Sequence, residues 1–130
     1  MPSVGKLLVA TALLELGAGL GLLAAPALVV MLLLGSRDPA PDTLVVARVA
    51  GAGLLAIALV CRLARDDPGS RSRHGLLWGI FVYNLGASVV LALAGFMLES
   101  VGVALWPVVV LHAIMAAWCA ASARTSTAGA

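Results

Sequence analysis

The chain has 130 residues, of which 62% are apolar and 11% charged, with a formal net charge of +2. Its mean hydropathy is +1.11. Since roughly 25% of the residues of a soluble domain are charged, this composition excludes an ordinary soluble enzyme and predicts an integral membrane protein. With roughly 20 residues per span, we expect four transmembrane helices in a single domain covering residues 1–130.

The first apolar stretch runs from Val4 to Leu34. Its start resembles a secretory signal, because Lys6 precedes the apolar run and Ala25-Pro26-Ala27 resembles a cleavage site. The run continues to Leu34, however, whereas the apolar region of a signal peptide is about 7 to 15 residues long. We therefore expect one retained transmembrane helix with a kink at Pro26.

Three further apolar stretches follow, separated by connections rich in charged residues, proline, glycine and serine. The predicted helices are about 4–34, 43–63, 75–98 and 101–122. The connection at Glu99-Ser100 is short, so the last two helices should form an antiparallel hairpin. Residues 124–130 are mostly small or polar, and we expect them to be disordered.

Basic residues gather at one end of these predicted helices. That end carries Lys6, Arg62, Arg65, Arg71, Arg73 and Arg124, whereas the connection at the other end carries only Arg37. Basic connections remain in the cytoplasm. The sequence therefore predicts an all-α, up-down bundle of four transmembrane helices with both termini cytoplasmic. The Ala, Val, Leu, Gly and Arg bias, with just one Lys, suggests a high-GC bacterial source.

Each apolar stretch carries one strongly polar side chain near its middle: Glu15, Arg48, Asn84 and His112. An isolated charge in hydrocarbon costs from about 2.5 to more than 10 kcal/mol, so such residues usually face the bundle interior and contact one another. We expect Glu15 to contact Arg48 on one side or His112 on the other. The predicted ligand site at the midplane also includes three neighbours on the same helices: Thr11, Tyr83 and Ser88.

Each of these residues also has a purely structural interpretation. Arg48 lies close to a helix end and could extend its guanidinium to the headgroups. Asn84 could hydrogen-bond a neighbouring helix, and His112 could be an interior histidine with its hydrogen bonds satisfied. Glu15 is the hardest to explain in this way, because a carboxyl group at the midplane either pairs with a cation or takes up a proton.

The sequence does not favour a metal site, haem or nucleic-acid binding. His112 and Cys119 have no further obvious metal ligands, and haem would need a second axial residue or an open site. Cys61 and Cys119 form no CxxC pair and are expected to be buried free thiols. No nucleotide-binding or hydrolase motif occurs, and the basic connection is too short for a nucleic-acid-binding module.

The four-helix pattern, with Glu15 in the first helix and Ala47-Arg48-Val49-Ala50-Gly51 near the start of the second, resembles the DoxX-like group of small bacterial membrane proteins. The resemblance implies an inner-membrane four-helix bundle, which in some members is an accessory part of redox systems that contact the quinone pool.

Three functions fit these observations, and a self-contained enzyme fits less well. The first is a binding site for a lipophilic small molecule, which could be quinone-like, held by Glu15, Arg48 and His112. The second is a structural or accessory subunit of a larger membrane complex. The third is a small transporter or proton-relay element. Besides the lipid bilayer, the expected partners are further copies of the chain or a larger complex, which would pack on faces of small residues at four-residue spacing.

Overall fold

The computed structural model describes residues 4–67 and 70–127, and every regular element within these ranges is helical. There are five helices in chain order: α1 (Val4–Ala24), α2 (Pro26–Leu34), α3 (Pro41–Ala64), α4 (Arg71–Met97) and α5 (Leu105–Thr127). This confirms the all-helical prediction.

Four of these helices are long and apolar enough to cross a membrane: α1, α3, α4 and α5. Their outer faces expose large apolar side chains, including Leu63 (73% exposed), Phe96 (78%) and Met97 (82%). Water-soluble monomers rarely expose contiguous apolar surface of this kind. The chain is therefore a multi-pass membrane protein.

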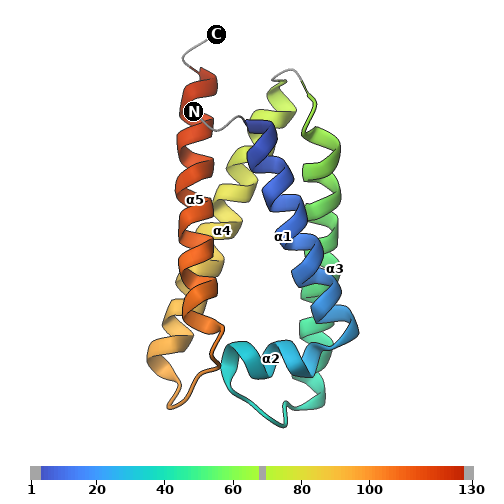
Figure 1. Cartoon of the computed structure of the whole chain (residues 1–130), viewed down its shortest axis with the longest axis vertical. Helices are drawn as coiled ribbons and strands as arrows, with labels where there is room; N and C mark the ends of the chain where they lie inside the picture. Colours follow the sequence, from blue (N-terminus) through green and yellow to red (C-terminus); the bar gives the residue numbers. More distant parts are fainter. Residues whose placement is uncertain (1–3, 68–69, 128–130) are drawn as a thin grey trace.

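The long helices are arranged as two closely packed pairs, with α1 along α3 and α4 along α5 (Figure 1). The first pair is close because glycines face each other where the helices approach: a Cβ on Gly19 would lie 2.9 Å from the carbonyl oxygen of Gly51, and one on Gly51 would lie 2.9 Å from that of Gly19. Small residues permit such backbone contact in membrane helices. Contacts between the two pairs are far fewer.

Among the described residues, the two pairs share a packed core near the start of α1 and the end of α5, which lie at the same end of the molecule (Figure 1). This core is made of buried apolar side chains from all four long helices: Leu7, Leu8, Ala12, Cys61, Leu77, Ile80, Met115, Cys119 and Ala123. Toward the opposite end the pairs diverge, and α2 lies across the space between them (Figure 1). The bundle is therefore tight in one half and open in the other.

Residues 4–34 differ from the single kinked helix expected from the sequence. The chain leaves the helical conformation at Ala25 (φ −138°, ψ 57°), and Pro26 opens the separate helix α2. Proline lacks an amide hydrogen and its ring clashes with the preceding turn of a helix, so it breaks a helix interior but suits a first helical position. The nine residues of α2 are too few to cross a bilayer.

Backbone hydrogen bonds join the end of α2 to the connection between α4 and α5. The amides of Gly102 and Ala104 donate hydrogen bonds to the carbonyl oxygens of Leu33 (3.0 Å) and Leu32 (2.9 Å). These carbonyls belong to the last turn of α2, where a helix leaves its oxygens without internal partners. A Cβ on Gly102 would overlap the backbone of Leu32, so this approach requires glycine.

The remaining helix limits differ modestly from those expected. Helix α3 begins at Pro41, and α4 begins at Arg71 after Ser70, whose hydroxyl oxygen accepts the backbone N–H of Arg73 (3.2 Å). Helix α5 begins later than expected, at Leu105. It continues to Thr127, so residues 124–127 of the expected disordered tail are helical, and residues 128–130 lie outside the described ranges.

Candidate functional site

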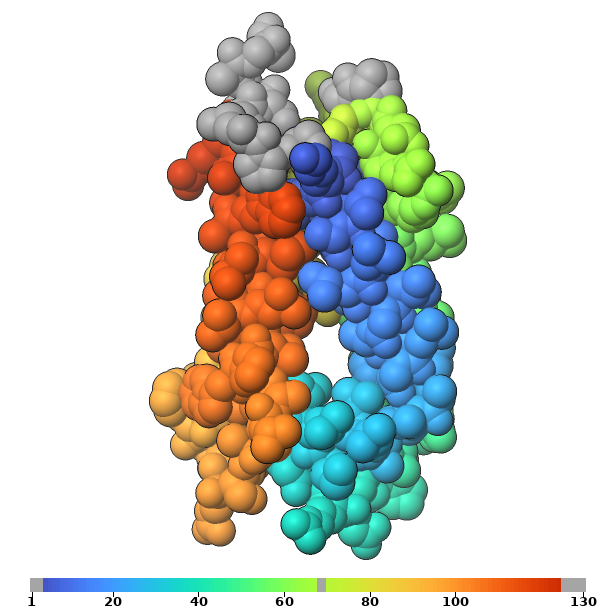
Figure 2. Space-filling view, in the orientation of Figure 1, coloured from blue at the N-terminus to red at the C-terminus, as the bar shows by residue number. Residues whose placement is uncertain are grey.

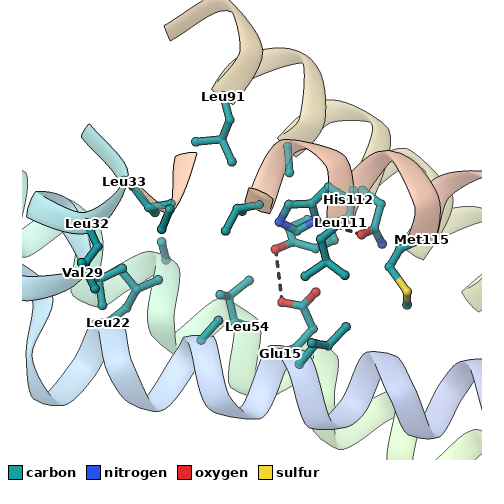
Figure 3. A pocket seen from close by; sticks show the side chains of 18 residues that line it. Glu15, Leu22, Val29, Leu32, Leu33, Leu54, Leu91, Leu111, His112 and Met115 are labelled. Carbon is teal, nitrogen blue, oxygen red and sulfur yellow. Dashed lines mark hydrogen bonds between the residues drawn. The ribbon is translucent and has the colours of Figure 1, made fainter. Parts of the chain in front are cut away.

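A cavity of about 490 Å³ lies between the two helix pairs, on the side of the packed core that faces α2 (Figure 3). Eighteen residues line it. Four of them are polar, namely Glu15, Tyr83, Asn84 and His112, and the others are aliphatic residues or Met115. Figure 3 shows Glu15 and His112 at one end and Leu22, Val29, Leu32 and Leu33 at the other. The cavity therefore has a polar end at mid-bundle and an apolar end at α2.

The cavity is open at the side of the molecule. Figure 2 shows an opening bounded by α1, α2 and α5 that is not closed by atoms behind it in this view. Tyr83 also borders a smaller groove of about 360 Å³, lined by residues of α3 and α4. Because the outer faces of these helices are apolar, the opening would face acyl chains rather than water in a bilayer.

The polar end is built around Tyr83. Its hydroxyl donates a hydrogen bond to Oε2 of Glu15 (3.2 Å, dashed in Figure 3). Its ring meets the imidazole of His112 edge to face, with centroids 5.7 Å apart and planes at 85°. Asn84, the next residue of α4, places Oδ1 2.9 Å from Nδ1 of His112 and donates from Nδ2 to the carbonyl oxygen of Ile80 (2.9 Å).

Helical periodicity explains why these side chains point inward. Glu15 is only 4% exposed and continues the buried stripe of α1 one turn beyond Thr11. Asn84 is 1% exposed and lies one turn beyond Ile80, a core residue of α4. The polar layer is therefore the continuation of the apolar core by one turn in each helix.

Arg48 does not take part in this site. It is exposed on α3, it does not line the cavity, and within the described ranges no hydrogen bond or ion pair joins it to Glu15. Ala47 and Gly51 are the buried residues here. Arg48 follows Ala47 by one residue, which turns it about 100° away from the buried face. The expected contact between Glu15 and Arg48 is absent, and exposure of Arg48 agrees with the interpretation that it extends toward the headgroups.

Two other residues expected at the site hydrogen-bond the backbone instead. The hydroxyl of Thr11 donates to the carbonyl oxygen of Leu7 (3.0 Å), and that of Ser88 donates to the carbonyl oxygen of Val109 (3.2 Å). Neither residue lines the cavity. Ser88 therefore links α4 to α5, whereas Thr11 satisfies its hydroxyl within its own helix.

The apolar end of the cavity was not anticipated from the sequence. It depends on α2, which contributes Val29, Leu32 and Leu33. The signal that could have revealed it is Pro26 followed by a short apolar run, since nine residues suit a surface or re-entrant segment better than a span.

The structure holds no indication of a metal centre within the described residues, where no group of three or more His, Cys, Asp or Glu residues could hold an ion. Cys61 and Cys119 are buried and free, and both belong to the packed core rather than to the cavity lining.

Comparison of the chain with models of protein families, with curated proteins and with solved structures found no match.

Proposed function

We propose that this protein binds a lipophilic small molecule within the membrane, with the polar part of the ligand at Glu15, Tyr83 and His112 and its apolar part extending toward α2. The observation that supports this most strongly is the cavity itself, which is apolar over most of its wall and polar at one end. Its volume of about 490 Å³ falls in the range of roughly 300 to 1,000 Å³ that is usual for small-molecule sites.

Access from the bilayer follows from the lateral opening between α1 and α5 (Figure 2). A molecule already dissolved in the membrane would reach the cavity without crossing water. In our proposal the chain crosses a bacterial inner membrane in an up-down path with both termini cytoplasmic, because six of the seven basic residues other than Arg48 belong to that end. The resemblance to DoxX-like proteins, and with it a quinone-like ligand, stays a prediction.

Binding fits this architecture better than conduction. A transporter or proton relay needs a polar path on both sides of the membrane centre, but the residues between the polar layer and the start of α1 form an apolar core in which Leu7 and Leu8 are 0% and Leu77 is 1% exposed. A role as an accessory subunit of a larger complex is compatible with ligand binding, because it depends on the outer surface and places no further requirement on the residues that line the cavity.

The proposal is tested by asking whether the cavity retains a molecule. The protein is reconstituted in nanodiscs made from a bacterial lipid extract and released for native mass spectrometry, which reports small molecules bound at one-to-one stoichiometry. We expect the wild type to retain such a molecule. Replacing Ala87, which lines the cavity, in Ala87→Phe should abolish retention by filling the space.

The matched control is Val89→Phe, the same new side chain on the same helix at an exposed position outside the cavity, which should retain the molecule. Glu15→Gln should weaken retention several-fold while the amount of folded protein changes little. Equal retention by the wild type and Ala87→Phe, or no retention by any of them, would contradict the proposal.

A further inference from the structure

We infer that the ligand of this cavity carries a headgroup that donates hydrogen bonds, such as a hydroxyl or an amine, because His112 presents an unpaired acceptor at the polar end of the cavity, while its own donor and that of Tyr83 are used within the chain. This inference rests on the proposed function and adds the chemical class of the headgroup.

The orientation of the Asn84 amide is fixed by its own helix. Its Nδ2 lies 2.9 Å from the carbonyl oxygen of Ile80. A carbonyl oxygen only accepts, so the amide group facing it must be the NH₂, and the group facing His112 must be Oδ1. With the amide reversed, two oxygens would face each other in a buried site. Asn84 therefore presents an acceptor to the imidazole.

That acceptor determines the tautomer of His112. Nδ1 lies 2.9 Å from Oδ1 of Asn84, so Nδ1 must carry the hydrogen and donate it. In a neutral imidazole one nitrogen donates and the other accepts, which leaves Nε2 as an acceptor. Nε2 forms no hydrogen bond with the described part of the chain. It is also not fully buried, since the fully buried atoms without a partner do not include it. Because His112 lines the cavity, this free acceptor is accessible from it.

Tyr83 has no free hydrogen for the ligand either. The single hydroxyl hydrogen of Tyr83 is used on Oε2 of Glu15. The other carboxyl oxygen, Oε1, has no hydrogen-bond partner among the described residues. It is partly accessible, since the fully buried atoms without a partner do not include it. Among the described residues no cation is paired with this carboxyl group, and Arg48 is exposed on α3 outside the cavity. Oε1 therefore accepts a hydrogen bond when the carboxyl is ionised and can donate one when it is protonated. The acceptor that the polar end offers to a donor is therefore Nε2 of His112.

A donor headgroup is favoured because a buried acceptor left unpaired costs free energy, whereas an ether or ketone cannot supply the missing hydrogen. A hydroxyl or an amine can donate to Nε2 of His112. If the ligand is quinone-like, the same inventory favours the hydroquinone, which has O–H donors, over the quinone, whose carbonyl oxygens only accept.

The test compares three probes that share a dodecyl chain and differ in whether the headgroup can donate a hydrogen bond. Wild-type protein in nanodiscs is titrated with 1-dodecanol, its methyl ether and 1-dodecylamine, and binding is measured by native mass spectrometry with Ala87→Phe as the background. We expect the alcohol to bind about 3- to 10-fold more tightly than the ether. His112→Phe removes Nε2 and should reduce this preference. The amine is a second probe that can donate a hydrogen bond. Tighter binding of both the alcohol and the amine than of the ether supports the inference, whichever of the two binds more tightly.

A second readout does not depend on any ligand. In ¹⁵N-histidine-labelled protein, the signals of His112, assigned by comparison with His74→Gln, should show hydrogen on Nδ1 and a bare Nε2. Hydrogen on Nε2, or equal binding of alcohol and ether, would overturn the inference while leaving the proposed function standing. Binding of none of the three probes above the Ala87→Phe background would instead remove the proposed function.

Discussion

Replacing Gly102 by alanine should detach α2 from the rest of the bundle. A Cβ at this position would overlap the backbone of Leu32 and approach the carbonyl oxygen of Met31. Because these are backbone atoms, no side-chain rotation relieves the overlap, and the connection must move away from α2. The movement would break the hydrogen bonds from Gly102 to Leu33 (3.0 Å) and from Ala104 to Leu32 (2.9 Å).

The expected cost is about 2 to 6 kcal/mol, from two hydrogen bonds at about 0.5 to 1.5 kcal/mol each and about 1 to 3 kcal/mol for overpacking. It can be measured by unfolding the protein with dodecyl sulfate in mixed micelles and following helicity. Hydrogen exchange should locate the damage in α2 and residues 101–104, with the core at the other end still protected.

The matched control for this prediction is Gly86→Ala. A Cβ on Gly86 would meet no heavy atom within 4 Å, so the same substitution should leave stability unchanged or raise it by about 0.5 to 1 kcal/mol through helix propensity. If Gly102→Ala is as stable as Gly86→Ala, and its α2 amides exchange no faster than in the wild type, then the hydrogen bonds from Gly102 and Ala104 do not hold α2 in place.

Three further predictions concern helix packing at Gly19, the exposed Arg48 and the two buried thiols. Gly19→Leu should destabilise the fold by about 1 to 3 kcal/mol more than Gly17→Leu in the same unfolding assay, because only Gly19 faces backbone of α3; equal effects would contradict close packing there. Arg48→Gln should change stability by no more than about 0.5 kcal/mol and leave retention of the bound molecule unchanged, and lost retention would return Arg48 to the site. Cys61 and Cys119 are both 0% exposed, so a membrane-permeant maleimide should label them only after unfolding, as mass spectrometry would show.

Composition was sufficient to predict four helices long and apolar enough to cross a membrane, because the hydrocarbon requirement acts on every residue of a span. Polar residues in mid-helix pointed to Glu15, Tyr83, Asn84 and His112, which do line the cavity. Position along a helix gives depth but not direction, and this is why Arg48, at a similar depth to the others, was expected at the site. A difference of one residue from the buried Ala47 turns its side chain toward the outside.

The separation of α2 from α1 was harder to anticipate for a different reason. Proline within a membrane helix is compatible with a kink as well as with a break, because neighbouring helices can satisfy the freed backbone groups. The choice between them depends here on contacts made far along the chain, from Gly102 and Ala104 to the end of α2. Such contacts have no local signature in residues 24–34, so the cavity end closed by α2 could not be derived from that stretch alone.

The lateral opening has a consequence for what selectivity can mean in this protein. In a bilayer the space between α1 and α5 would never stand empty, since lipid tails would fill it whenever nothing else does. Tails are as apolar as leucine side chains, so a visiting molecule gains almost nothing by exchanging one hydrocarbon surface for another. Selectivity between ligands therefore depends on the few polar atoms around Tyr83. The protein distinguishes ligands by their headgroup rather than by the length of their apolar chain.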